Sequence, residues 1–226
     1  MRYSNLRWFV LSALILVSPL MARERTGELA PAEVQKTQKA IMKALKEGNE
    51  YHMAHIIRKS GLPKVMVVSC ADSRVPPEAV FHMKPGELYV NRAWGNIVDK
   101  VILGSLEYGA THLHCSVLVV LGHTDCTALQ QAIKEYDHPK ATEALWRSLN
   151  LQDLNGRLQP AVEAVTDKSL TEAQRLDATV RTNVINTMRT IREQSPTLWQ
   201  LENGDLLKIV GCVYHIDGGR VEWIKE

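Results

Sequence analysis

Residues 64–74, KVMVVSCADSR, place a short apolar run directly before a group of polar and thiol side chains. Residues 116–126, SVLVVLGHTDC, repeat this design further along the chain. Both runs are β-branched and do not alternate with polar residues, as expected of strands buried on both faces of a parallel sheet. If the strands are neighbours, their ends meet at the carboxyl edge of the sheet, where α/β proteins carry their sites. The two stretches therefore predict an α/β fold with a functional site at that edge.

The rest of the chain alternates between strand and helix patterns. Further strands are expected at 87–91 and 206–214, and residues 220–225 follow a glycine turn as a hairpin partner. The expected helices lie at 98–110, at 127–136, at 171–194 with Thr171 or Leu170 near its cap, and, as a short helix, within 150–170. The inner face of the helix at 98–110 is expected near Val101, Ile102, Leu106 and Tyr108. This order predicts a mainly parallel central sheet, flanked by helices and closed by an antiparallel C-terminal edge strand.

The N-terminus has the features of a targeting sequence. Two arginines precede the apolar stretch 8–17, and Pro19 follows it, which is the order found in secretory signal peptides. The stretch is shorter than a membrane span requires. We expect residues 1–22 to be a signal peptide and the product to be periplasmic or secreted, without stable membrane association after cleavage. If Met21 is the true start, the product is cytoplasmic.

Residues 23–30 are polar and are expected to form a linker, and residues 31–226 to form a single domain. The domain begins with one or two helices between residues 31 and 59, with a break expected at Gly48-Asn49. This N-terminal helical arm has no pattern of reactive side chains. We therefore expect it to pack on a partner subunit.

Composition limits the classes of partner. Hydrophobic residues make up 45% of the chain and charged residues 23%, both ordinary values for a globular domain. The formal net charge is +2, and the basic residues are mixed with acidic ones. Because nucleic-acid-binding proteins concentrate basic residues in a stripe or patch, we expect no nucleic-acid partner.

Cys70, His123 and Cys126 form a candidate metal site at the two strand ends. Thiolate and imidazole are ligands that zinc prefers. One close pair of ligands with a distant third differs from the two paired knuckles of a structural zinc ribbon. Three protein ligands leave a fourth tetrahedral position, which is either open or filled by Asp72. The sequence therefore predicts one Zn²⁺ per subunit.

The four cysteines also permit disulfide bonds. A Cys70–Cys126 bridge is the alternative to metal binding, although the neighbouring His and Asp residues favour ligation. Cys115 and Cys212 lie in or beside predicted strands and are expected to be small buried apolar side chains. A Cys115–Cys212 bridge is compatible with the sequence.

Asp72 and Arg74 are the candidate catalytic residues. Two thiolates leave a zinc ion almost uncharged, so acidification of its water depends on surrounding groups. Arg74 can hold Asp72 in a bidentate pair, and Asp72 can then accept a hydrogen bond from zinc-bound hydroxide and orient it. Released from Arg74, Asp72 could close the site by binding zinc. The alternative is an ion pair without a chemical role. Asp125, between two ligands, is expected to face solvent or to cap a helix.

These motifs are similar to those of a known family. Residues 70–74, CADSR, and 123–126, HTDC, resemble the two signature motifs of the β-class carbonic anhydrases. The likeness extends over roughly residues 33–226 and includes 92–96, RAWGN, and 104–108, GSLEY. Each short motif is weak alone, but the two together, in this order and at this separation, are specific.

The resemblance implies a zinc lyase that reversibly hydrates carbon dioxide to bicarbonate and a proton. It implies zinc ligation by Cys70, His123 and Cys126, with zinc-bound hydroxide oriented by the Asp72–Arg74 dyad. It also implies that the zinc domain self-associates as a dimer or tetramer, with the N-terminal arm reaching a neighbour.

Three positions depart from the family pattern. Gly61 stands where many plant-type members carry a substrate-binding Gln, Thr127 replaces a frequent Gly, and Val67 replaces the Trp of a bicarbonate inhibitory site. These departures concern substrate binding and regulation and leave the ligand set intact. Two alternatives are a carbon disulfide or carbonyl sulfide hydrolase on the same scaffold, and a non-catalytic zinc-stabilised oligomer with Asp72 permanently on zinc.

Overall fold

The computed structural model describes residues 31–55, 62–139 and 148–225. The expected signal peptide and linker lie outside these residues. The chain divides into two compact units, with the boundary after Ile56, and the single domain expected over 31–226 stays a prediction. In the described residues, no helix combines the length and apolar character needed to cross a membrane.

The first unit contains helix α1 (Pro31–His55). This helix runs without interruption through Gly48 and Asn49, so the break expected there is wrong. A glycine inside a helix costs about 1 kcal/mol, and the Lys, Ala, Leu and Glu residues around it are strong helix formers that outweigh this cost.

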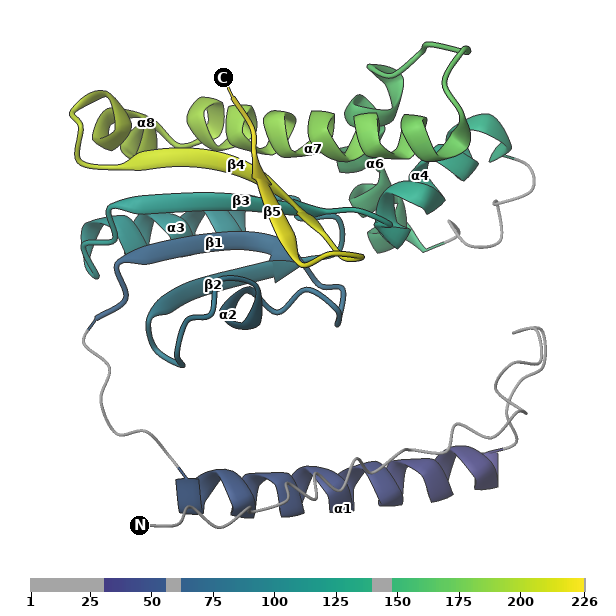
Figure 1. Ribbon diagram of the computed structural model, residues 1–226, viewed down its shortest axis with the longest axis vertical. Coiled ribbons are helices and arrows are strands. Elements are labelled where there is room, and N and C mark those ends of the chain that lie inside the picture. Colours follow the sequence, from purple (N-terminus) through teal and green to yellow (C-terminus); the bar gives the residue numbers. More distant parts are fainter. Residues whose placement is uncertain (1–30, 56–61, 140–147, 226) are drawn as a thin grey trace, which may run out of the picture. The chain divides into compact units, whose positions relative to one another are not determined.

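The second unit is built on one five-stranded sheet in the order β2-β1-β3-β4-β5 (Figure 1). Its strands are β1 (Val65–Cys70), β2 (Leu88–Ala93), β3 (Val117–His123), β4 (Lys208–His215) and β5 (Arg220–Trp223). The first four are parallel, and β5 pairs antiparallel with β4. The predicted fold class, including the antiparallel C-terminal edge strand, is confirmed.

Most helices follow the strands as expected. The described helices of this unit are α2 (Pro77–Val80), α3 (Lys100–Thr111), α4 (Thr127–Asp137), α6 (Leu149–Glu163), α7 (Glu172–Gln194) and α8 (Pro196–Asn203). Helix α6 spans 15 residues where only a short helix was predicted, and α8 was not predicted. In Figure 1, α7 lies along β4 and β3, and α3 lies behind β3 and β1.

The sheet has a hydrophobic core on each face. Alternate residues of β1 enter opposite cores: Met66 and Val68 pack in the larger core with α3 and α7, and Val67 packs in the smaller one. Phe81, at the end of α2, packs against the smaller core. Burial on both faces explains why the strand sequences do not alternate.

Helix α7 positions part of the functional site, and its own sequence determines its ends. Thr171 and Gln174 form a reciprocal capping box at its start, and Ser195 ends it and caps α8. Val184 is buried against the sheet, where a Cβ added at Gly122 or Gly211 would come within 2.7 Å of its methyl groups. The two glycines therefore allow α7 to approach β3 and β4 closely.

Candidate metal centre

The predicted ligands meet where the parallel strands end. Cys70 is the last residue of β1, His123 is the last residue of the neighbouring β3, and Cys126 directly precedes α4. All three side chains are buried, and their ligand atoms lie within 4.8 Å of one another. The structure therefore brings together the residues that the sequence analysis assigned to zinc.

Hydrogen bonds from other elements hold Cys70 in place. The backbone N–H of Gly95 donates to the Cys70 sulfur at 3.3 Å, and the side chain of Asn183 on α7 donates to the Gly95 carbonyl at 2.8 Å. Gly95 has a φ of +80°, and a Cβ there would lie 2.7 Å from a methyl group of Leu158. Glycine is thus required both for the backbone conformation and for space.

Arg92, at the exposed side of β2, fixes the backbone of the loop after β1. Its Nε donates to the carbonyl of Cys70 at 2.9 Å, and its Nη2 donates to the carbonyl of Asp72 at 2.5 Å. Sequence reasoning did not assign a role to Arg92 or Asn183. The only signal for Arg92 was its place in the RAWGN segment.

The orientation of His123 prepares one ring nitrogen for a metal. Its Nδ1 lies 2.8 Å from the carbonyl of Thr124, which can only accept, so Nδ1 carries the proton. Its Nε2 is buried and has no hydrogen-bond partner among the described residues. Leaving a buried acceptor unpaired costs about 1–3 kcal/mol, and coordination of a metal would satisfy it.

The two thiols are also suited to a cation. A hydrogen bond from Cys126 is the main cause that lowers the pKa of Cys70, and the same interaction together with burial raises the pKa of Cys126. The pair therefore readily gives up a first proton and holds the second. A divalent cation favours the loss of both, because the thiolate is the form that binds metal. The orphan imidazole nitrogen and these thiols fit Zn²⁺.

Asp72 is bound to Arg74 and is not part of the ligand cluster. Arg74 donates through Nε to Oδ1 at 3.0 Å and through Nη2 to Oδ2 at 2.7 Å, and its backbone N–H donates to Oδ1 at 2.9 Å. These hydrogen bonds lower the pKa of Asp72 to about 2. Asp72 is therefore a carboxylate that accepts hydrogen bonds at any physiological pH.

Asp125 has a larger part than the sequence suggested. Its carboxylate accepts from Nη1 of Arg74 at 2.7 Å and from the side chain of Gln130 at 2.6 Å, although part of it faces solvent as expected. No helix cap by Asp125 is seen, and α4 has no side-chain cap. The left-handed backbone of Asp125, with a φ of 53°, accompanies this arrangement.

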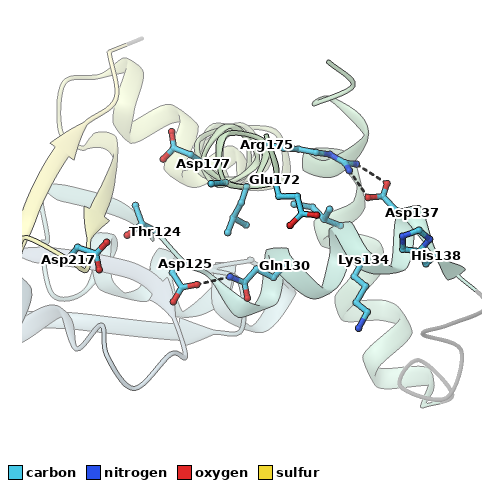
Figure 2. Close-up of a pocket in the computed structure, with 13 residues that line it drawn as sticks. Thr124, Asp125, Gln130, Lys134, Asp137, His138, Glu172, Arg175, Asp177 and Asp217 are labelled. Carbon is cyan, nitrogen blue, oxygen red and sulfur yellow. Dashed lines mark hydrogen bonds and ion pairs between the residues drawn. The ribbon is translucent and has the colours of Figure 1, made fainter. Parts of the chain in front are cut away.

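A cleft of about 660 Å³ opens beside this turn, between α4 and α7. Figure 2 shows Asp125 and Gln130 next to each other on one side of the cleft and the Arg175–Asp137 ion pair on another. Thr124, next to His123, also lines the cleft. Solvent thus reaches the outer side of the turn that carries two of the ligands.

All four cysteines are free and buried, so both disulfide alternatives are wrong. The thiol of Cys115 donates to the carbonyl of Pro63 at 3.2 Å. Burial raises the pKa of Cys212 to about 12. Both therefore behave as the small apolar side chains that were predicted.

Comparisons with known proteins decide the family. The model of the carbonic anhydrase family matches residues 65–221. The chain belongs to this family. Carbonic anhydrase 2 of Mycobacterium tuberculosis is 31% identical over 194 residues, which cover 80% of this chain and 90% of that protein. The carbonic anhydrase of Pseudomonas aeruginosa is 35% identical over 166 residues, which cover 71% of this chain and 72% of that protein.

Solved structures place the chain in the β class of carbonic anhydrases. The β-carbonic anhydrase of Coccomyxa has a TM-score of 0.63 and 25% identity, with 89% of this chain and 88% of that chain covered. A chain from the crystal structures of two tetrameric β-carbonic anhydrases of Sordaria macrospora has the same TM-score at 20% identity, covers 86% of this chain and 96% of that chain, and shows the same fold. The resemblance inferred from the motifs is confirmed, and with it the enzyme class.

Proposed function

We propose that this carbonic anhydrase reversibly hydrates carbon dioxide to bicarbonate and a proton, with one Zn²⁺ per subunit held by Cys70, His123 and Cys126. The observation that supports this best is a buried three-ligand cluster with an Arg-bound carboxylate beside it. Three protein ligands are typical of catalytic zinc sites. Zinc bound there supplies a nucleophile at neutral pH by lowering the pKa of a coordinated water.

The role of Asp72 follows from its charge and its partner. With its pKa near 2, the carboxylate cannot donate a hydrogen bond and can only accept one. An attacking O–H group that donates to Asp72 turns its lone pair away from the carboxylate and toward the substrate. Arg74 positions Asp72 for this task, because it holds both carboxylate oxygens. Asp72 is the proposed catalytic residue, and Arg74 acts through it.

Stopped-flow measurement of carbon dioxide hydration tests the proposal. Asp72→Asn should lower kcat by about 10²-fold, a typical contribution of one proton-accepting group, with zinc content unchanged. Arg74→Ala should also lower kcat, because it frees Asp72. Asp217→Asn removes an exposed carboxylate of the neighbouring cleft and is the matched control.

The outcomes separate the alternatives. A zinc-loaded wild type without activity between about pH 6.5 and 9 would contradict the proposal and favour a non-catalytic zinc-stabilised protein. Equal activity of wild type and Asp72→Asn would remove the carboxylate from the mechanism. Carbonyl sulfide and carbon disulfide, assayed with the same preparations, test the other hydrolase activity.

We propose in addition that the chain self-associates as a dimer or tetramer. Helix α3 exposes Val101 and Tyr108, and α1 exposes Ile41, Met42 and Leu45. Apolar side chains that share one face of a helix, as residues seven apart on α3 and four apart on α1 do, favour a protein partner. Size-exclusion chromatography with light scattering should give two or four times the chain mass of 25.4 kDa. A monomer at assay concentrations would contradict this.

A further inference from the structure

We propose that Asp125 and Gln130 form a latch that positions Arg74 and so keeps Asp72 away from the fourth position on the metal. The latch is defined as the Asp125 carboxylate, its carbonyl oxygen and the Gln130 amide. The inference rests on the proposed zinc site but not on the reaction catalysed there. It assigns a positioning role to two residues whose side chains form no hydrogen bond with the candidate ligand atoms or with Asp72 among the described residues.

The contacts of the latch are extensive for an exposed guanidinium. Asp125 accepts from Nη1 of Arg74 at 2.7 Å through Oδ2 and from Nη2 at 3.0 Å through its backbone carbonyl. Gln130 donates to Oδ1 of Asp125 at 2.6 Å (Figure 2). Together with the two bonds to Asp72, four of the five N–H donors of a guanidinium have partners. Asp72 and Asp125 use different donor edges, so they do not compete for Arg74.

Asp125 gives Arg74 a second anchor of a kind that Asp72 cannot provide, because Asp72 belongs to the same loop as Arg74. The Arg74 side chain is 40% exposed, whereas the Asp72 side chain is 9% exposed. Asp72 is tied to Arg74 within the same loop, whereas Asp125 lies 51 residues away on the turn between two ligands. The latch therefore fixes the guanidinium relative to the ligand turn, and not only relative to its own loop.

The movement that the latch opposes is rotation of the Asp72 side chain towards the metal. Arg92 already holds the backbone of the loop at the carbonyls of Cys70 and Asp72. The Asp72 carboxylate, which also accepts from the backbone N–H of Arg74, can then exchange its bonds to the guanidinium for a metal that is bound at the neighbouring sulfur of Cys70. A guanidinium held from both sides makes that exchange less favourable.

Anion binding to the cobalt-substituted full-length protein tests the latch. Thiocyanate that enters the fourth position changes the visible absorption of Co²⁺. Because sites that Asp72 has closed do not bind thiocyanate, the apparent affinity falls in proportion to the fraction of sites that remain open. Asp125→Asn should weaken thiocyanate binding about fivefold, the size that one partly exposed ion pair allows. Asparagine tolerates the left-handed backbone at this position, so the fold is preserved. Gln130→Met should have a smaller effect in the same direction.

A double variant separates the latch from structural damage. Asp72→Ala cannot reach the metal, so adding it to Asp125→Asn should restore the thiocyanate affinity of Asp72→Ala alone. Asp217→Asn removes an equal charge nearby and should leave the affinity unchanged. Simple electrostatics predicts the opposite sign, because removing a negative charge near the metal favours an anion.

The results that overturn the latch are therefore specific. They are an equal or tighter thiocyanate affinity in Asp125→Asn, or a weakened affinity that Asp72→Ala does not restore. If the thiocyanate affinities follow the expected pattern but the protein does not hydrate carbon dioxide, the latch is supported and the proposed function is contradicted. If the protein hydrates carbon dioxide but Asp125→Asn leaves the thiocyanate affinity unchanged, the proposed function is supported and the latch is contradicted.

Discussion

Gly122 directly precedes the ligand His123, and the structure leaves no room for a methyl group there. A Cβ at this position would lie 2.6 Å from Cγ2 of Val184 and 3.3 Å from Cγ1 of Val180. Val184 is completely buried, and a β-branched side chain in a helix has one strongly preferred rotamer, so it cannot turn away. Gly122→Ala should therefore lower the free energy of unfolding by about 1–3 kcal/mol through overpacking.

Gly122→Ala and a second substitution, Val184→Ala, should compensate each other. Val184→Ala alone should cost about 2 kcal/mol through lost burial and a cavity. In the double variant the new methyl group enters the space that Val184 vacates, so the combined loss should fall short of the sum by about 1 kcal/mol or more. Urea unfolding followed by circular dichroism, at one protein concentration and with zinc bound, measures this coupling. Zinc content per chain reports whether His123 is displaced.

A matched glycine provides the control. Gly156 is an exposed residue of α6 with no atom within 4 Å of an added Cβ. Gly156→Ala should raise stability by about 0.5–1 kcal/mol, because alanine is the better helix former. The same chemical change is thus expected to have opposite signs at two sites. Strictly additive effects of Gly122→Ala and Val184→Ala, or a neutral Gly122→Ala, would refute the close approach of α7.

Three further predictions concern the surroundings of the site and the ends of the fold. Asn183→Ala removes the hydrogen bond to the buried Gly95 carbonyl, which should cost about 1–3 kcal/mol and weaken zinc retention in a chelator competition. The hydrogen bond from Arg181 lowers the pKa of Glu222 to about 2, below the ordinary 4.5. The stabilisation that ionised Glu222 provides is therefore present above pH 4.5 and is lost as the pH falls towards 2. Acid unfolding curves of Glu222→Gln should lack this loss of stability between pH 4.5 and 2. Thr171→Ala should cost about 1 kcal/mol by removing the α7 cap, whereas Thr171→Ser should retain it in thermal unfolding.

The sheet could be predicted because each of its parallel strands is a short apolar run with a polar end. Helix faces were harder. Val101 and Tyr108 were expected near the inner face of α3, yet these residues are 79% and 50% exposed, and Leu103 is buried instead. Helix α3 is apolar on more than one side, so tertiary packing chooses the buried face. Helix α6 was underestimated because it contains Gly156 and Pro160, and burial of its other apolar residues outweighs their low propensity.

The meeting of the three candidate ligands could be predicted, and the residues that support them could not, for the same topological reason. Parallel neighbouring strands bring Cys70 and His123 to one edge, and this rule requires only local patterns. The contact between Arg74 and Asp125 spans 51 residues, and that between Asn183 and Gly95 spans 88. No spacing in the sequence encodes such pairs. They depend on how a particular turn and a particular helix come to rest against the sheet.

These supports divide into two groups that act on different properties of the site. Asn183 and Gly95 act on Cys70 and therefore on how tightly the metal is held. Asp125 and Gln130 act on Arg74, which makes no contact with a ligand atom, and therefore on where the Asp72 carboxylate rests. Because the groups share no hydrogen bond, their substitutions should combine additively in metal affinity and in anion access. Under the two proposals, the fold holds the three candidate ligands in place and leaves the Asp72 carboxylate to bind either Arg74 or the metal.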